Sequence, residues 1–225
     1  MSEIVLAIFA HPDDETLACG GTLAKHVQAG DHVHVVVLTD GVGARGTRAG
    51  VRQRREAFDQ ATRQVIGARQ ASCAADVHSH DWQDQRLDEA PLLDLVQWIE
   101  ERVAGLRPSI VYTHSRGDLN RDHQIVAEAV LVATRPQPGC SVKRLYAGEV
   151  LSSTDWGPSP FQPSVFVQIE DYLSAKLTAA HCYQAELRPW PHPRSITGIT
   201  TLAKLRGMTV GVEYAEAFEL LREIR

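Results

Sequence analysis

Short apolar runs alternate along most of this chain with segments whose apolar residues recur at helical spacing. This alternation restricts the fold more than any other feature of the sequence. Five short runs are predicted to be strands, and the run 32–38 is rich in β-branched residues: 3–10, 32–38, 109–113, 143–151 and 164–169. Six segments carry apolar residues at helical spacing: 16–29, 52–66, 91–103, 122–134, 172–187 and 195–206. The apolar residues of 215–224 fit neither period, so strand and helix both remain open there. The alternation predicts an α/β fold, a parallel sheet with helices on both faces.

Length and composition favour one ordinary globular domain. The chain has 225 residues, of which 44% are hydrophobic, and a chain of this size buries a sufficient core without disulfides or a structural metal. It contains no repeat, low-complexity tract or linker, so we expect a single domain over residues 1–225. The four cysteines form no CxxC pair and are expected to be buried free thiols: Cys19, Cys73, Cys140 and Cys182.

Charge and hydropathy argue against two classes of partner. Asp and Glu (28) outnumber Lys and Arg (23), and the formal net charge of −5 gives no overall attraction for nucleic acid or an anionic membrane surface. The longest apolar run, Ile4–Ala10, is much shorter than the roughly 20 residues of a membrane span, and no basic segment of a signal peptide precedes it. We therefore expect a cytoplasmic protein that acts on a small molecule.

A glycine-rich segment after the second predicted strand imitates a nucleotide-binding motif. Gly41-Val-Gly-Ala-Arg-Gly46 matches G-x-G-x-x-G, but that fingerprint normally opens the helix of the first strand–helix turn, with an acidic residue about 20 positions later. Here the predicted helix starts at Arg52, and the nearest acidic residues, Glu56 and Asp59, lie inside it. The sequence favours a loop at an active site over a nucleotide site.

The strongest candidate for chemistry is His11-Pro-Asp-Asp-Glu15, which follows the first predicted strand directly. Open α/β sheets bind their ligands at the carboxyl ends of the strands. Three adjacent carboxylates repel one another unless a cation or a set of donors compensates. The acids could simply begin the next helix, where negative charge is favourable, but that explanation leaves out His11.

A second polar cluster, Asp118-Leu-Asn-Arg-Asp-His123, follows the predicted strand 109–113 and again begins a helix. Two strand ends of one parallel sheet bring such groups to the same edge. His11, Asp14 and His123 would then supply two histidines and one carboxylate, three protein ligands with an open position, as in catalytic zinc sites. Asp13 would remain unligated beside the bound water.

The two clusters resemble the motifs of the LmbE-like, or PIG-L, N-acetylglucosaminyl deacetylases. That family carries His-Pro-Asp-Asp-Glu after its first strand and an Asp-His pair at a later helix start, as at Asp122–His123. The segments Tyr112–His123, His192–Ser195 and Ala215–Phe218 are similar to family blocks in the same order. The resemblance implies a Rossmann-like fold, zinc-dependent removal of an acetyl group from a GlcNAc-type sugar, and a homo-oligomer.

The resemblance also implies roles for matching positions. It implies one Zn²⁺ ion per chain, or another divalent metal, on His11, Asp14 and His123, with Asp13 as the general base. The chemistry agrees, because zinc lowers the pKa of water and a nearby carboxylate can accept its proton.

One position departs from the family pattern. Some relatives have a histidine three residues before the metal histidine, paired with the intervening aspartate, where this chain has Asn120. An amide cannot act as an acid at neutral pH. The proton for the departing amine must then come from Asp13 or from another histidine, for which His192 is the first choice. Asp122 would still orient a ligand or a neighbouring imidazole.

Four residues are candidate substrate contacts. Tyr112 and His114 could stabilise the oxyanion, and Arg52 could bind a hydroxyl, phosphate or carboxylate of the substrate. Asn120 completes the set, since it lies in the second cluster.

Three alternatives remain open. The first is a deacetylase or amidase acting on an N-acyl compound that is not a sugar. The second is a sugar-phosphate or nucleotide-binding module built on Gly41–Gly46, which predicts no tightly bound metal and leaves Asp122 and His123 unexplained. The third, a non-haem iron oxygenase, also uses two histidines and one carboxylate, but that class is usually an all-β barrel.

Overall fold

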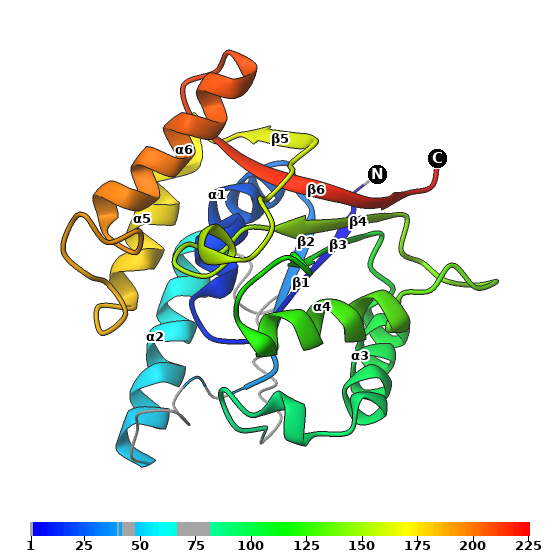
Figure 1. The fold of residues 1–225 in the computed structure, drawn as a ribbon. Coiled ribbons are helices and arrows are strands. Elements are labelled where there is room, and N and C mark those ends of the chain that lie inside the picture. Colours follow the sequence, from blue (N-terminus) through cyan, green and yellow to red (C-terminus); the bar gives the residue numbers. More distant parts are fainter. Residues whose placement is uncertain (1, 40, 42–47, 67–81) are drawn as a thin grey trace.

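The structure, a computed structural model, describes residues 2–39, 41, 48–66 and 82–225. It is built on a six-stranded sheet with the order β2-β1-β3-β4-β6-β5 (Figure 1). The strands are β1 (Ile4–Phe9), β2 (His32–Val37), β3 (Ile110–His114), β4 (Arg144–Gly148), β5 (Val165–Gln168) and β6 (Ala215–Glu223). Strands β1 to β4 run parallel to one another, and β6 is antiparallel to both β4 and β5. The predicted mostly parallel α/β fold is therefore confirmed.

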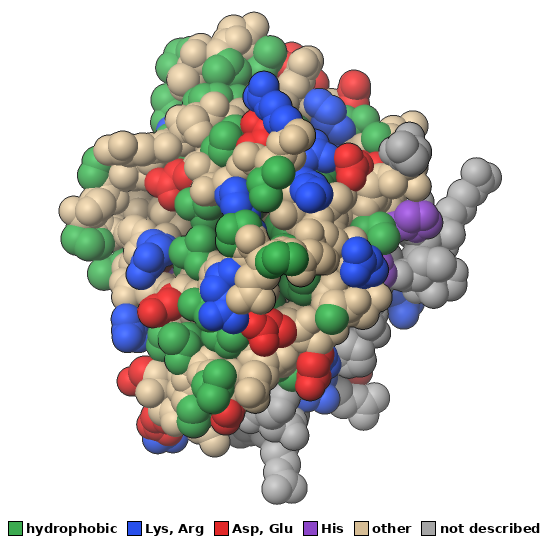
Figure 2. All heavy atoms as spheres, turned by 90° about the vertical axis from the view of Figure 1, so that its right-hand side faces the viewer, with side chains coloured by type: hydrophobic (Ala, Val, Ile, Leu, Met, Phe, Trp, Pro, Cys, Tyr) green, Lys and Arg blue, Asp and Glu red, His purple; other side chains and the backbone are tan. Residues whose placement is uncertain are grey.

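Within the described residues, six α-helices pack on the two faces of the sheet: α1 (Asp14–Gln28), α2 (Arg48–Ile66), α3 (Leu92–Leu106), α4 (Arg121–Ala133), α5 (Leu173–Cys182) and α6 (Ile196–Val210). Three short 3₁₀ helices lie in the connections: η1 (Leu87–Glu89), η2 (Thr154–Trp156) and η3 (Glu170–Tyr172). No helix in the described ranges is both long and apolar enough to cross a bilayer. On the face shown in Figure 2, basic and acidic side chains are interspersed.

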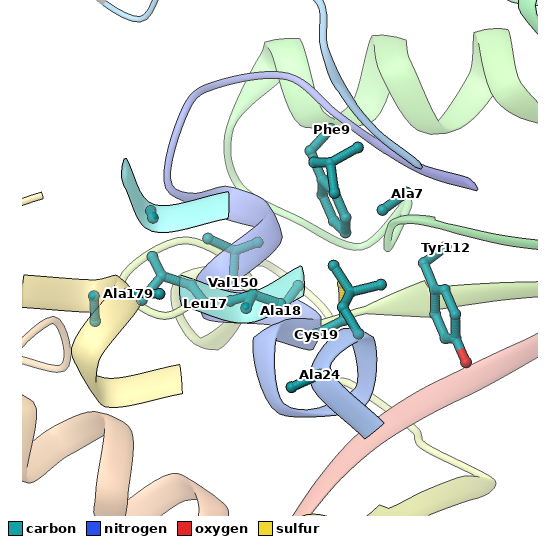
Figure 3. Packing of buried hydrophobic residues seen from close by; sticks show 14 of the residues in the cluster. Ala7, Phe9, Leu17, Ala18, Cys19, Ala24, Tyr112, Val150 and Ala179 are labelled. Atoms are coloured by element: carbon teal, nitrogen blue, oxygen red, sulfur yellow. The ribbon is translucent and has the colours of Figure 1, made fainter. Parts of the chain in front are cut away.

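Alternate residues of β1 belong to two separate hydrophobic clusters, because successive side chains of a strand point to opposite faces. Val5, Ala7 and Phe9 lie in the first cluster, which α1, α2, α5 and α6 cover, whereas Leu6, Ile8 and Ala10 lie in the second, beneath α3 and α4 (Figure 1). Figure 3 shows the first cluster, in which Phe9 and Ala7 lie near Leu17, Ala18 and Cys19 of α1. Burial on both faces explains why the strands read as continuous apolar runs.

Several boundaries differ from those predicted. Helix α2 begins at Arg48, four residues before the predicted start, and α5 ends at Cys182 rather than at residue 187. The ambiguous segment 215–224 forms β6, whose first four residues are buried while most of the others are partly exposed. No single period describes such a strand. Cys19 is buried as predicted, but Cys140 and Cys182 are only half-buried, and Cys73 lies outside the described residues.

Helix α1 is broken at Cys19, whose φ and ψ of −143° and 17° are not helical. Beyond the break, the backbone N–H groups of Gly21 and Thr22 donate to the carboxylate of Glu216 on β6, at 2.9 and 2.6 Å. Lys176 Nζ donates to Leu17 O at 2.8 Å and to Glu216 Oε1 at 2.5 Å. Glu216 therefore caps the second half of α1 and compensates the buried charge of Lys176.

Replacing Glu216 by Ala is expected to destabilise the protein by about 3–5 kcal/mol, the usual cost of breaking a buried ion pair. The change leaves the Lys176 ammonium and two backbone donors without their acceptor. Urea unfolding measures the loss, with exposed Glu213→Ala as the matched control, for which a change within about 0.5 kcal/mol is expected. Equal stability of the two variants would show that this cap contributes nothing.

Candidate active site

Both polar clusters lie at one edge of the sheet, where β1 and β3 end as neighbours. Strand β2 pairs with the other side of β1, so the strand order reverses between β1 and β3. Crevices at such switch points are the usual ligand sites of open α/β sheets. The segment 11–15 leads from β1 into α1, and 118–123 leads from β3 into α4, so the topology brings the two segments together.

Three buried side chains direct one ligand atom each to a common point: His11, Asp14 and His123. His11 Nδ1 lies 3.1 Å from His123 Nε2 and 3.2 Å from Asp14 Oδ2, and this oxygen lies 3.3 Å from His123 Nε2. Ligands held at roughly 2.0–2.1 Å by a tetrahedral zinc ion are about 3.3 Å apart. The spacing of the three atoms therefore suits a divalent metal ion.

The outer nitrogen of each imidazole faces a carboxylate. His11 Nε2 lies 3.1 Å from Asp122 Oδ2, and His123 Nδ1 lies 3.1 Å from Asp118 Oδ2. When these nitrogens donate, the unprotonated nitrogens of both rings point towards each other and towards Asp14. Asp14 Oδ1 is also buried, with no hydrogen-bond partner among the described residues. Converging lone pairs of this kind need a cation or protons, so the donor set fits a metal.

The charges of the cluster shift its pKa values in opposite directions. Burial opposes ionisation, yet the positive charge of His123 and a hydrogen bond from His11 hold the pKa of Asp14 well below its usual range. Burial likewise opposes protonation of His11, but hydrogen bonds to Asp122 and Asp14 raise its pKa well above the usual value. The site thus retains an ionised carboxylate and attracts positive charge.

Asp13 lies between the metal ligands in sequence and has an unusual backbone. Its φ of 114° is left-handed, a conformation that costs a residue other than glycine of order 1–3 kcal/mol and that is common at functional sites. Its N–H donates to Glu15 Oε2 at 3.0 Å, and its Oδ2 accepts from Arg194 Nη1 at 2.8 Å. Burial raises the pKa of Asp13 to about 6, although the charge of Arg194 lowers it.

A cavity of about 1010 Å³ opens onto this cluster. His11, Asp13 and Arg194 line it, together with residues of α2 and of the segment after α5. Binding pockets for small molecules span about 300–1,000 Å³, so the cavity is large enough for a sugar bearing a further group. Trp156, of which 53% is exposed, also lines it.

Two other predicted site residues lie on the same cavity. His192 lines it and accepts a hydrogen bond from Arg194 N at Nδ1, at 3.0 Å, so its neutral ring carries a proton on Nε2. Asn120 lines it as well and caps α4, because its side chain accepts from Asp122 N. Both are therefore available to a ligand that reaches Asp13.

The structure differs from the predicted roles of Tyr112 and His114. The Tyr112 side chain lies in the first hydrophobic cluster with its hydroxyl 2.9 Å from His26 Nε2, and His114 is fully buried. Neither side chain lines the cavity, so neither is placed to contact a substrate there. Tyr112 belongs to the hydrophobic core, and His114 lies beside His123 and Asp14. Asp122 is buried with its Oδ2 3.1 Å from His11 Nε2, a contact that agrees with the predicted orientation of an imidazole, and it also accepts from the backbone N–H of Leu87.

Other predictions fall partly outside the described residues. Arg52 lies in α2, but its side chain is outside the described part of the chain, as are residues 42–47 of the glycine-rich segment. Gly41 is described, with a φ of +68°, and a Cβ there would lie 2.7 Å from Pro12 Cδ. A glycine is therefore required at this position by its close approach to the first motif.

Asp118 and Arg194 lie at the site but were not predicted from the sequence to be site residues. Asp118 begins the second polar cluster, and its place five residues before His123 was the available indication. Arg194 follows His192 by two residues in a segment already singled out. Arg194 and Asp13 are 181 positions apart in the sequence, and a local sequence pattern cannot predict a contact between residues so far apart.

Comparisons with known proteins relate the chain to deacetylases. The PIG-L family model, described as GlcNAc-PI de-N-acetylase, matches residues 6–134. The uncharacterized deacetylase YaiS of Escherichia coli K12 is 32% identical over 183 residues, which cover 78% of this chain and 87% of that protein. The 1D-myo-inositol 2-acetamido-2-deoxy-α-D-glucopyranoside deacetylase of Mycolicibacterium smegmatis is 30% identical over 170 residues, 63% of this chain and 58% of that protein.

Solved structures show the same fold. The N,N'-diacetylchitobiose deacetylase from Pyrococcus horikoshii, in complex with its inhibitor, aligns with a TM-score of 0.77 over 98% of this chain and 84% of that chain. The identity is 19%, so this likeness concerns the fold alone. The matched family model spans both polar motifs and more than half of the sequence, and the chain therefore belongs to the PIG-L family.

Proposed function

We propose that this protein is a zinc-dependent N-deacetylase that hydrolyses the acetamide group of a GlcNAc-type sugar. The observation that carries the proposal is the convergence of His11 Nδ1, Asp14 Oδ2 and His123 Nε2, with the Asp13 carboxylate on the adjoining cavity. The activity that describes the family model and that of the mycobacterial relative support an N-acetylated aminosugar as substrate. The donor set of two histidines and one carboxylate, which holds zinc in catalytic sites of other proteins, supports zinc as the metal to test first.

Each residue has a distinct part in the proposed reaction. His11, Asp14 and His123 would hold the ion, which when bound lowers the pKa of water and polarises a carbonyl group. The Asp13 carboxylate accepts a proton from the attacking water as the acetyl carbonyl is attacked. A pKa of about 6 for this buried group suits a base that works near neutral pH.

Arg194 holds Asp13 in position for this step. Its Nη1 donates to Asp13 Oδ2 at 2.8 Å, and its Nε donates to Ser152 Oγ at 2.8 Å. We expect Arg194→Gln to lower kcat by about 10- to 100-fold with zinc retained, a small misplacement of a catalytic group being costly. Steady-state kinetics and the zinc content of the same sample test this. Parent kcat in the variant would show that Asp13 needs no such support.

His192 is the proposed donor of the proton to the departing amine. To donate, His192 would have to be an imidazolium with a proton on each ring nitrogen, so its Nδ1 would have to give up the hydrogen bond that it accepts from Arg194 N. His192→Ala is expected to lower kcat by roughly 10²- to 10⁴-fold, the usual range for general acid catalysis. If His192 only bound substrate, KM would rise and kcat would be unchanged, which would remove it from the proton transfer.

Release of a primary amine tests the whole proposal. The panel holds N-acetylglucosamine, N,N'-diacetylchitobiose and N-acetylglucosaminyl-inositol, with N-acetyl amino acids as non-sugar substrates. Zinc-loaded protein is expected to release amine from at least one sugar, and chelator-stripped protein is expected to release none. Release from the amino acid derivatives alone would favour the non-sugar amidase. A zinc-loaded protein inactive on every substrate would contradict the proposed reaction.

A further inference from the structure

We propose that His114 is a positioning residue that holds the two metal-ligating histidines in their relative arrangement. The inference rests on the metal site of the proposed function. His114 is the last residue of β3, and its side chain is fully buried and absent from the lining of the cavity. It therefore touches neither solvent nor substrate, and any effect it has on the reaction must pass through its neighbours.

The first contact of His114 fixes the backbone beside His11. Main-chain pairing between β1 and β3 ends at Ala7 and Tyr112. Beyond that point Ala10 N donates to His114 Nε2, a buried hydrogen bond of 2.8 Å, so a side chain of β3 continues the connection between the strands. Ala10 immediately precedes His11, and this bond sets where the chain leaves β1.

The second contact of His114 fixes the ring of His123. The two imidazoles are stacked, with centroids 3.9 Å apart and planes inclined by 13°. Phe9 packs edge-on against His114, with centroids 4.8 Å apart and an angle of 87°. His114 is thereby held in place by β1 and acts as a flat support for His123, while Asp118 fixes the Nδ1 end of that ring.

The hydrogen bond also defines the form of the His114 ring. Because Nε2 accepts from an amide N–H, that nitrogen carries no proton, and the neutral ring has its proton on Nδ1. A neutral His114 ring adds no positive charge beside the proposed cation. The Nε2 atom of His114 lies 3.5 Å from Asp14 Oδ2. One side chain thus contacts the strand end before His11, the ring of His123 and the surroundings of Asp14.

Three substitutions separate the two contacts. His114→Gln retains a hydrogen-bond acceptor without the stacked ring, His114→Phe retains a ring without the acceptor, and His114→Leu has neither. Leu95→Ala serves as a control, because Leu95 is fully buried in α3 and belongs to the hydrophobic cluster on the other face of the sheet. It lowers stability through packing alone.

Zinc affinity of the full chain is the measurement, by competition with a chromophoric chelator after the protein has been stripped of metal. Groups that orient metal ligands contribute about 10- to 100-fold to metal affinity. We expect the zinc Kd to rise about 10-fold in His114→Gln and in His114→Phe, and about 100-fold in His114→Leu. The visible absorption of the Co²⁺-substituted variants is expected to change shape, whereas Leu95→Ala retains the parent Kd and spectrum while melting at a lower temperature.

Each contrary outcome is distinct. A zinc Kd for His114→Leu within twofold of the parent value would overturn the positioning role and leave the metal site standing. A matching loss of affinity in Leu95→Ala would also overturn it, because general destabilisation would then suffice. A parent protein that binds no zinc would overturn both the inference and the metal-dependent function.

Discussion

Asp13→Asn is expected to lower kcat by a factor on the order of 10² to 10⁴ while zinc and the fold are retained, since this is the usual contribution of a general base. The amide has nearly the shape of the carboxylate but cannot accept the proton of water. Asn also tolerates positive φ better than most residues, and its carbonyl oxygen can still accept from Arg194, so the 114° backbone and its neighbours stay in place.

The comparison needs kcat, KM and zinc content on the same preparation of parent and variant. Asp13→Ala is a poorer choice, because it leaves the half-buried guanidinium of Arg194 without its partner at 2.8 Å. It also places alanine, which has no polar side chain to compensate, at a left-handed position. Full activity in Asp13→Asn would remove Asp13 from the proton transfer, whatever its distance from the metal.

His123→Ala is expected to remove zinc outright, with the Kd rising by more than the roughly 100-fold that follows loss of an outer partner. Only His11 and Asp14 of the predicted set would remain, and the ring that stacks on His114 and faces Asp118 would be gone. Activity should fall to background, because both the water and the carbonyl would lose their cation.

Metal analysis after dialysis against a weak chelator tests this directly. The control is His181→Ala, which alters an exposed histidine on α5 and should retain one zinc ion per chain. Stoichiometric zinc in His123→Ala would exclude His123 as a ligand and would turn attention to another of the clusters around it, such as His11 with Asp84 and Asp122.

The sequence was sufficient to predict where the site lies, because a parallel sheet fixes the direction of its strand ends. The segments 11–15 and 118–123 follow β1 and β3, and these strands are neighbours, so the two motifs had to meet. It could not predict the face on which a side chain of β3 lies. All five residues of that strand are buried, so no polar alternation indicates that Tyr112 belongs to the core.

Long-range charge contacts were also beyond the sequence. The pairs Arg194–Asp13 and Lys176–Glu216 join segments 181 and 40 positions apart, and each depends on how loops or helices pack after the sheet has formed. The boundaries of α2 and β6 were uncertain for a related reason. Helix propensity and strand period describe a segment in isolation, whereas pairing with β4 and β5 decides the structure of 215–223.

The left-handed backbone at Asp13 has a consequence for directed evolution. Glycine adopts this conformation at little cost, but Asp13→Gly alone would leave Arg194 without its partner. Selection for thermal tolerance alone should therefore enrich Asp13→Gly together with an apolar residue at Arg194, a pair that relieves the backbone and removes both charges. Such clones would resist heat and fail to turn over substrate. At this position thermal stability and catalytic activity therefore favour different residues. A library of variants that is screened for stability without an activity assay would be enriched in stable but inactive proteins.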